Sequence, residues 1–165
     1  MGKDRRLVVD NDEQLGFCSL ECSIEVQKLG LILDSPFACY VDDKEFVLFG
    51  GEISLNGTPA PLMQQAFYFF RESYGLKHLI EFDDPNYITT TYPDYTSWVK
   101  SMNDDYKQYW IGTYRTYEEA EQACLDKLIS LGREQFKARQ KELLTEMMRG
   151  DEELGLCDNE SKYGK

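Results

Sequence analysis

The fold is indicated by two adjoining stretches, Tyr106-Lys-Gln-Tyr-Trp-Ile-Gly-Thr-Tyr114 and Thr116-Tyr-Glu-Glu-Ala-Glu-Gln-Ala-Cys-Leu-Asp-Lys-Leu-Ile129. The first is rich in aromatic and β-branched residues, which favour a strand. The second opens with Thr116 and Glu119, whose spacing is typical of a capping box at a helix N-terminus. A strand followed at once by a capped helix indicates that α and β elements share one domain.

Upstream of these stretches, short elements alternate with turn residues. We expect helices at 19–29 and 58–74, ended by Gly30 and Gly75, with Thr58 as N-cap and Pro59 in the first turn. We expect a hairpin from 37–41 and 45–49, a strand at 79–82, and an extended insertion at 87–105 with a helical turn at 94–102. These elements predict an α+β fold with a small, mostly antiparallel sheet and helices on one face.

Downstream, Gly132 marks a helix end or a weak point, and a further amphipathic helix follows at 133–149, ended by Gly150. Phe136, Leu143 and Met147 lie on its apolar stripe, which could pack on the sheet, form a homodimer or enter a partner's groove. The predicted organisation is a flexible arm (1–16), an α+β domain (17–132), an amphipathic helix (133–149) and a disordered acidic tail (150–165).

The chain has 165 residues and a formal net charge of −12. An acidic body repels phosphate backbones, so nucleic acid is a disfavoured partner. This net charge is ordinary for a cytoplasmic protein. It also suits a surface that imitates the charge of DNA and occupies a basic groove on another protein. No apolar run is long enough for a membrane helix, and the N-terminus lacks the pattern of a secretory signal.

Catalytic and metal-binding motifs are few. Five cysteines without a secretory signal indicate reduced thiols, and Cys22, Cys39 and Cys124 suit buried apolar positions. His78 is the only histidine, so a four-ligand zinc site lacks partners. Three groups of acidic residues could bind a metal ion if the fold brings them together. Each group falls in a predicted turn, where Asp is favoured for its hydrogen bonds to the backbone. The groups are Asp42-Asp43, Glu81 with Asp83-Asp84, and Asp104-Asp105. We expect no cofactor.

Aromatic residues are dense between Tyr87 and Tyr117. Few basic residues lie among them, which argues against stacking on single-stranded nucleic acid. Tyr and Trp are favoured at protein interfaces, and some of these residues must also fill a core. With the acidic pair nearby and the 133–149 stripe, the interface candidates are Tyr92, Tyr95, Trp98, Asp104, Asp105, Tyr109, Trp110, Phe136, Leu143 and Met147.

Three stretches, Ala60 to Gly75, Tyr106 to Tyr114 and Thr116 to Ile129, resemble a family of small uncharacterised proteins encoded by phages and prophages of gut bacteria. Members show an aromatic-x-x-Arg-Glu helix and then a Tyr-Glu-Glu-Ala helix. The resemblance covers about residues 18–132 and carries no chemistry. It implies a role in host takeover or in evasion of bacterial defence.

Three hypotheses for function follow. The leading one is a non-enzymatic protein-binding module that acts in the bacterial cytoplasm on a host or phage protein with a basic surface, as an inhibitor or anti-defence protein. The second is a small-ligand- or metal-binding enzyme that gathers His78 with the Asp-rich turns. The third is a virion or assembly component that self-associates through 133–149.

Overall fold

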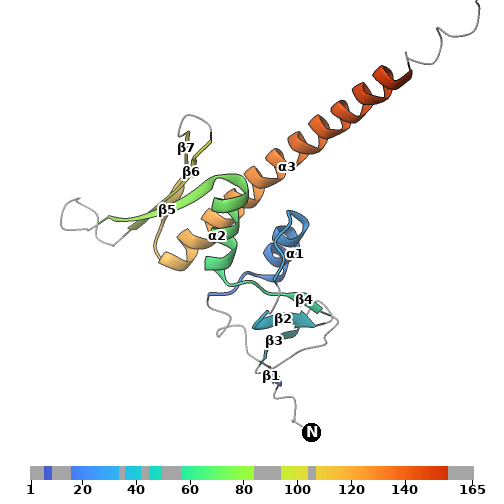
Figure 1. Ribbon diagram of the computed structural model, residues 1–165. Coiled ribbons are helices and arrows are strands. Elements are labelled where there is room, and N and C mark those ends of the chain that lie inside the picture. The colour runs from blue at the N-terminus through green and yellow to red at the C-terminus, as the bar shows by residue number, and fades with distance from the viewer. Residues whose placement is uncertain are drawn as a thin grey trace, which may run out of the picture. The chain divides into compact units, whose positions relative to one another are not determined.

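The computed structural model describes residues 6–8, 16–33, 36–41, 45–49, 57–83, 94–103 and 107–155. Its elements are β1 (Arg6–Val8), α1 (Leu20–Lys28), β2 (Ala38–Val41), β3 (Glu45–Phe49), β4 (Gly57–Pro59), α2 (Met63–Tyr74), β5 (Leu76–Asp83), β6 (Asp94–Ser101), β7 (Gln108–Tyr114) and α3 (Tyr117–Gly155) (Figure 1). Helices and antiparallel sheets in one chain confirm the α+β class. The chain divides into two compact units, Met1–Gly132 and Arg133–Lys165.

The first sheet has the order β1-β3-β2-β4, with antiparallel neighbours throughout. The predicted hairpin is confirmed, since β2 and β3 pair in the register Ala38↔Leu48 to Val41↔Glu45. Two details differ from the prediction. The segment predicted as a flexible arm contains β1, and Pro59 pairs with Cys39 in β4 rather than starting a helix. A proline without an N–H is tolerated in an edge strand.

Helix α2 begins at Met63, four residues later than the predicted Pro59. The side chain of Gln65 turns back and accepts a hydrogen bond from the Leu62 backbone N–H at 2.9 Å, which satisfies one of the free donors at the helix start. The predicted end at Gly75 is confirmed. Its φ of 62° is left-handed, and a Cβ there would lie 2.4 Å from the Asn103 side chain, so only glycine fits.

The second sheet has the order β5-β6-β7 and is antiparallel. Strand β6 occupies the segment where we expected a helical turn at 94–102, so that prediction is wrong. Pairing on both edges of β6 overrides the local preference, and the strand alternation buries Ser97, Val99 and Ser101 on one face. A register shift between Ser97 and Trp98 interrupts the pairing with β7.

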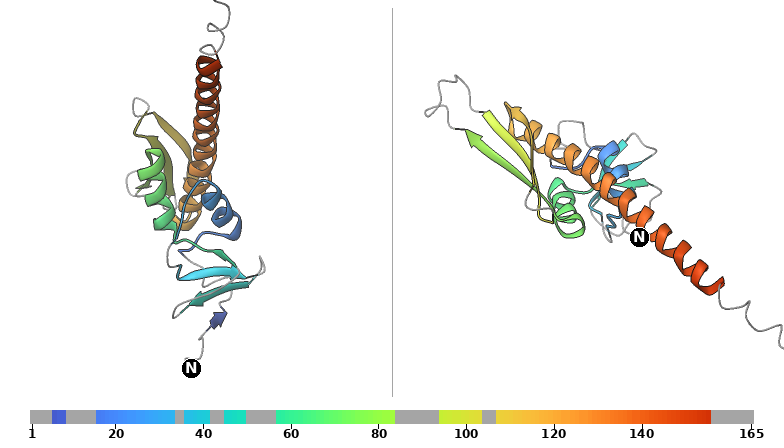
Figure 2. Two further views of the ribbon diagram at one scale, coloured as in Figure 1. Left: turned by 45° about the vertical axis from the view of Figure 1, so that its right-hand side comes forward. Right: turned by 90° about the horizontal axis from the view of Figure 1, so that it is seen from above.

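Helices cover the face of this sheet that carries Ser97 and Val99, as the fold prediction expected (Figure 2). Helix α2 packs against β5, and Ser97 Oγ donates a hydrogen bond to the Ala120 carbonyl of α3 at 3.3 Å. Fully buried side chains of this layer include Val26, Phe70, Leu76, Val99, Leu125 and Leu128. The interior of the first unit is therefore apolar and well packed.

Helix α3 starts at the predicted capping box. Thr116 Oγ1 accepts from the Glu119 N–H at 3.2 Å, and the Thr116 N–H donates to the Glu119 carboxylate at 3.4 Å. The helix continues to Gly155, so the predicted end at Gly150 is wrong, and of the two alternatives for Gly132 the helix end is wrong. A Cβ on Gly132 would lie 2.8 Å from the Phe70 ring, so this glycine allows close packing rather than ending the helix.

Candidate binding surfaces

One cross-strand row on the uncovered face of the β5–β7 sheet is apolar. Leu79 pairs with Trp98, and Trp98 pairs with Trp110; we call these three residues the Trp row. Leu79 is 41% exposed and Trp110 is 62% exposed. The indole N–H of Trp98 is buried and has no hydrogen-bond partner among the described residues. The row therefore offers exposed apolar area at Leu79 and Trp110, whereas the polar atom of Trp98 is buried.

The rows on either side of the Trp row are polar. Lys77 pairs with Lys100 on one side, and Glu81 pairs with Thr96 on the other. Because side chains two residues apart along a strand share a face, all four lie on the same face as the Trp row. The two lysines and the glutamate therefore place opposite charges on the two sides of the Trp row.

The structure separates the predicted interface aromatics. Trp98 and Trp110 share the uncovered face, whereas Tyr95 and Tyr109 alternate onto the helix-covered face. Tyr95 lies 5.3 Å from the Phe82 ring and 6.0 Å from the Tyr117 ring. The ammonium groups of Lys107 and Lys127 lie 5.0 and 5.2 Å from the Tyr109 ring centroid. These two tyrosines therefore already have neighbours within the unit.

Other predicted residues lie outside the described ranges: Tyr92, Asp104, Asp105, and Asp42, Asp43 and Asp84 of the acidic turns. No group of three or more His, Cys, Asp or Glu side chains suited to a metal ion occurs among the described residues. Cys22, Cys39 and Cys124 are buried, as predicted, and so is Cys18. Burial raises the pKa of each of Cys18, Cys22 and Cys124, which keeps these thiols protonated and unreactive.

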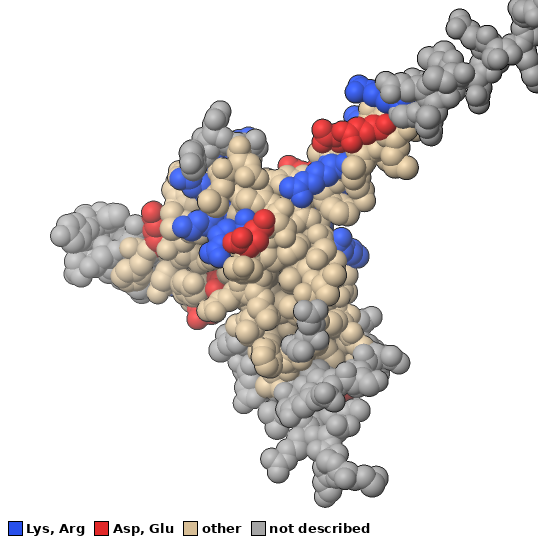
Figure 3. Space-filling view, viewed as in Figure 1, with Lys and Arg blue, Asp and Glu red and all other residues tan. Residues whose placement is uncertain are grey.

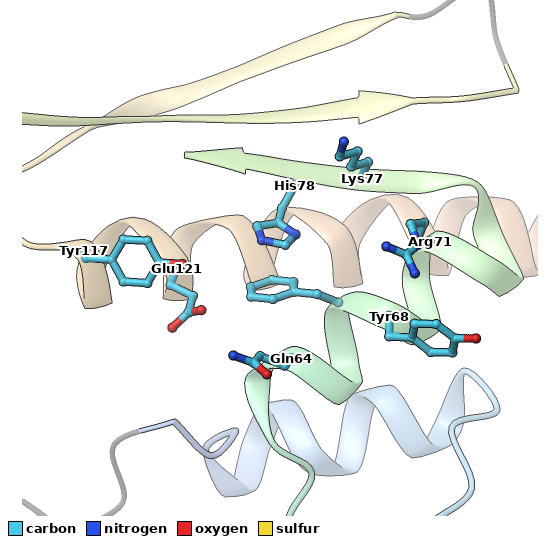
Figure 4. A pocket seen from close by; sticks show the side chains of 8 residues that line it. Gln64, Tyr68, Arg71, Lys77, His78, Tyr117 and Glu121 are labelled. Atoms are coloured by element: carbon cyan, nitrogen blue, oxygen red, sulfur yellow. The ribbon is translucent and has the colours of Figure 1, made fainter. Parts of the chain in front are cut away.

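His78 lines a pocket of about 360 Å³ between α2, β5 and the first turns of α3 (Figure 4). Its imidazole stacks on Phe67 with ring centroids 3.8 Å apart. Arg71 and Tyr68 lie toward one end of the pocket, and Tyr117 and Glu121 lie toward the other. On the face seen in Figure 3, basic and acidic side chains lie together over α2 and β5, and the Arg71 Nε lies 3.0 Å from the Glu72 carboxylate. The pocket thus has a guanidinium at one end and a carboxyl at the other.

Burial alters the titration of the groups in this pocket. Burial lowers the pKa of His78, and the nearby charges of Lys77 and Arg71 lower it further. Burial raises the pKa of Glu121, with Glu118 adding to the effect and a hydrogen bond from Tyr117 opposing it. A neutral imidazole and a carboxyl that retains its proton more readily both offer hydrogen bonds to a ligand. Perturbed groups in a pocket are a feature of binding and catalytic sites.

A second hollow of about 560 Å³ lies on the other side of α2. It shares Gln64 and Tyr68 with the His78 pocket and is otherwise mainly apolar, with Leu31, Ile32, Leu33, Leu62 and Phe69 among its lining residues. Ile32 is 82% exposed at its rim. Sequence reasoning missed this groove because Leu31 to Leu33 follow the helix-ending Gly30 and show no periodicity.

In the second unit, α3 exposes most of its apolar stripe. Leu143 and Leu144 are 59% and 58% exposed, Met147 and Met148 are both 69% exposed, and Phe136 is partly buried. The 133–150 part of the helix therefore presents the predicted stripe on its surface.

Leu79, in the Trp row, was missed as an interface candidate. Its signal would have been the cross-strand pairing with Trp98 rather than any local motif.

Comparison with protein-family models, with curated proteins and with solved structures found no match. Among the described residues, no helix has both the length and the apolar character needed to cross a membrane.

Proposed function

We propose that this chain is a non-enzymatic protein-binding module that docks on its partner through the Trp row. The observation that carries the proposal is the exposure of Trp110 and Leu79 beside Trp98 on the uncovered sheet face. Trp side chains are enriched among the residues that dominate binding energy. Leaving the apolar side chains of Leu79 and Trp110 in water is unfavourable, and covering them with a partner removes that cost.

The flanking residues favour one kind of contact on the partner. Lys77 and Lys100 lie beside the row, so carboxylates opposite them would be attracted. The net charge of −12 acts at longer range and favours a partner whose overall charge is positive. The same net charge opposes single-stranded nucleic acid on this face.

The resemblance to phage-encoded proteins supports a cellular setting for this proposal. A module of this kind would act in the cytoplasm of a gut bacterium, on a host protein whose surface it occupies. Inhibition of a defence protein fits a binding face built around exposed apolar side chains. An acidic chain also fits the occupation of a groove that normally receives DNA.

The test is capture from a gut-bacterial lysate with matched variants. Trp110→Ala should lose the partner, while Phe37→Ala should keep it, since Phe37 is a similarly exposed aromatic outside the β5–β7 sheet. Lys77→Glu should weaken capture if carboxylates face this side. Unfolding midpoints of all variants show whether each remains folded. A recovered protein set that is the same for wild type and Trp110→Ala would refute the proposal.

The His78 pocket supports a second candidate, binding of a small bipolar molecule. An anionic group could pair with Arg71 while a hydrogen-bond donor reaches Glu121 at the opposite end. A thermal-shift screen with nucleotides, divalent metals and zwitterionic amino acids tests this, because a ligand that binds only the folded state raises Tm. Arg71→Gln should abolish the shift. Lys28→Gln should not, since Lys28 forms an ion pair with Glu25 at 3.0 Å, as Arg71 does with Glu72, but does not line the pocket.

A further inference from the structure

The apolar stripe of α3 beyond Gly132 has the spacing of a coiled-coil seam. Phe136, Gln140, Leu143 and Met147 follow one another at intervals of four, three and four residues. This alternation keeps one narrow face of a helix against a partner helix. Leu144 and Met148 widen the seam on one side, and the two leucines and two methionines are each more than half exposed. A second helix is therefore the kind of surface that fits.

The charges beside the seam are complementary to those of an identical helix that runs the other way. Arg139 and Glu146 each precede a seam residue by one position, Gln140 and Met147. In an antiparallel pair these flanking positions face their equivalents, which brings Arg139 of one copy toward Glu146 of the other. In a parallel pair Arg139 would instead face the apolar Leu144. From this complementarity we propose that residues 136–147 pair with the same segment of a second copy as an antiparallel two-helix coiled coil.

The register of this dimer follows from matching the seam residues. Phe136 of one copy lies opposite Met147 of the other, and Gln140 lies opposite Leu143, which gives four layers related by a twofold axis. A polar Gln140 in two of the layers lowers stability but penalises other registers. This inference concerns α3 alone and is independent of the Trp row, so either proposal can fail without the other.

Sedimentation of the full-length chain over a range of concentrations tests self-association. Wild type should show a monomer–dimer equilibrium. Leu143→Asp should raise the dissociation constant by at least about tenfold, because it places a charge in the seam. Thr145→Asp adds the same charge on the opposite face of the helix and should change the constant much less. A monomer at every concentration, or a dimer unaffected by Leu143→Asp, overturns the proposal.

Disulfide trapping tests the direction of the helices. Phe136→Cys and Met147→Cys are made on separate, differently tagged chains that also carry Cys157→Ser, and are then mixed and oxidised with diamide. The antiparallel register places positions 136 and 147 together and separates identical positions by roughly 16 Å along the axis, at about 1.5 Å per residue. Only the mixed disulfide should form, since Cα atoms must approach to about 4.4–6.8 Å. Disulfides between identical chains would overturn the antiparallel arrangement.

The charge pair supplies an independent readout. Arg139→Glu places two acidic groups together and should weaken the dimer by about threefold to tenfold, more at low salt than at high salt. Adding Glu146→Arg to the same chain restores the complementary pair and should restore the dissociation constant. Failure of the double variant to recover would refute the Arg139–Glu146 contact. A seam that binds a different protein in place of a second copy would leave the chain monomeric in sedimentation.

Discussion

The two halves of α3 carry similar apolar side chains in very different surroundings. The first half, within residues 117–132, buries Ala120, Cys124, Leu125, Leu128, Ile129 and Leu131 against α1, α2 and the sheet layer. The second half leaves Leu143, Leu144, Met147 and Met148 exposed. Both halves are regular helix and both show helical periodicity of apolar residues.

This contrast separates two kinds of information in a sequence. Periodicity identifies which residues share a face of a helix, and the structure agrees with it in both halves. Periodicity does not identify what covers that face. In the first half the cover is the chain's own core, and in the second half we propose that it is another copy of the chain.

The largest expected difference between the halves is in the effect of truncating a leucine. Leu125→Ala removes a fully buried side chain and should lower the free energy of unfolding by about 3 kcal/mol. Leu144→Ala should change it by less than about 0.5 kcal/mol in dilute solution, because that side chain is exposed. Urea unfolding followed by circular dichroism measures both. Equal losses would mean that the second half also packs on its own chain.

Glycine substitution sharpens the comparison. Gly132→Ala would press a methyl group against Phe70 and Leu29, at 2.8 and 3.2 Å, and should cost about 1–2 kcal/mol despite the better helix propensity of alanine. Gly150→Ala in the second half should leave stability unchanged or raise it slightly. Thermal unfolding of the two variants compares them. A stabilised Gly132→Ala would show that the contact relaxes easily.

These glycines show why part of the fold could be predicted and part could not. Gly75 and Gly132 both follow an apolar helical stretch, so the sequence predicts a helix end at each. Gly75 ends α2 because its φ is left-handed. Gly132 lies inside α3, where Phe70 and Leu29, far away in the sequence, leave no room for a larger side chain. Local signals suffice where the cause is local and fail where it is a distant contact.

The candidate surfaces follow the same rule. Trp98 and Trp110 could be chosen as interface residues from aromatic density alone. Leu79 lies in the same cross-strand row because of the strand pairing and the register shift after Ser97. No local sequence motif encodes this pairing or this shift. The expected helical turn at 94–102 was wrong for that reason, since pairing with two neighbours decides the conformation of β6. The His78 pocket likewise joins residues of α2, β5 and α3.

A smaller difference is expected from removing a threonine hydroxyl in each half. Thr116→Ala deletes the capping hydrogen bond to the Glu119 N–H and should cost about 1 kcal/mol. Thr145→Ala deletes a bond from its hydroxyl to the Lys141 carbonyl, which is already used within the helix, so stability should change by less than about 0.5 kcal/mol. Chemical denaturation compares the two. If Thr116→Ala leaves the free energy of unfolding unchanged, water replaces the capping hydrogen bond without loss of stability.

The smallest expected effect is the pH dependence of stability that arises at the His78 pocket, which the first half of α3 lines with Tyr117 and Glu121. The pKa of His78 is lowered in the folded protein, so the unfolded chain binds a proton more readily. Stability should therefore fall as the pH drops below about 6.5, the ordinary value for histidine. His78→Gln should flatten that fall between pH 7.5 and 5.5 in urea unfolding.

Glu121 provides the opposing control, because a raised pKa makes the folded state bind the proton more readily. Acidification through the raised pKa of Glu121 therefore adds stability to wild type, and Glu121→Gln removes that gain. The Glu121→Gln variant should lose more stability than wild type as the pH is lowered toward 4.5, the ordinary value for glutamate, whereas His78→Gln should lose less as the pH is lowered through 6.5. Variants that shift in the same direction would contradict the assignment of opposite pKa changes to the two ends of one pocket, and would place the titrating group elsewhere in the first unit.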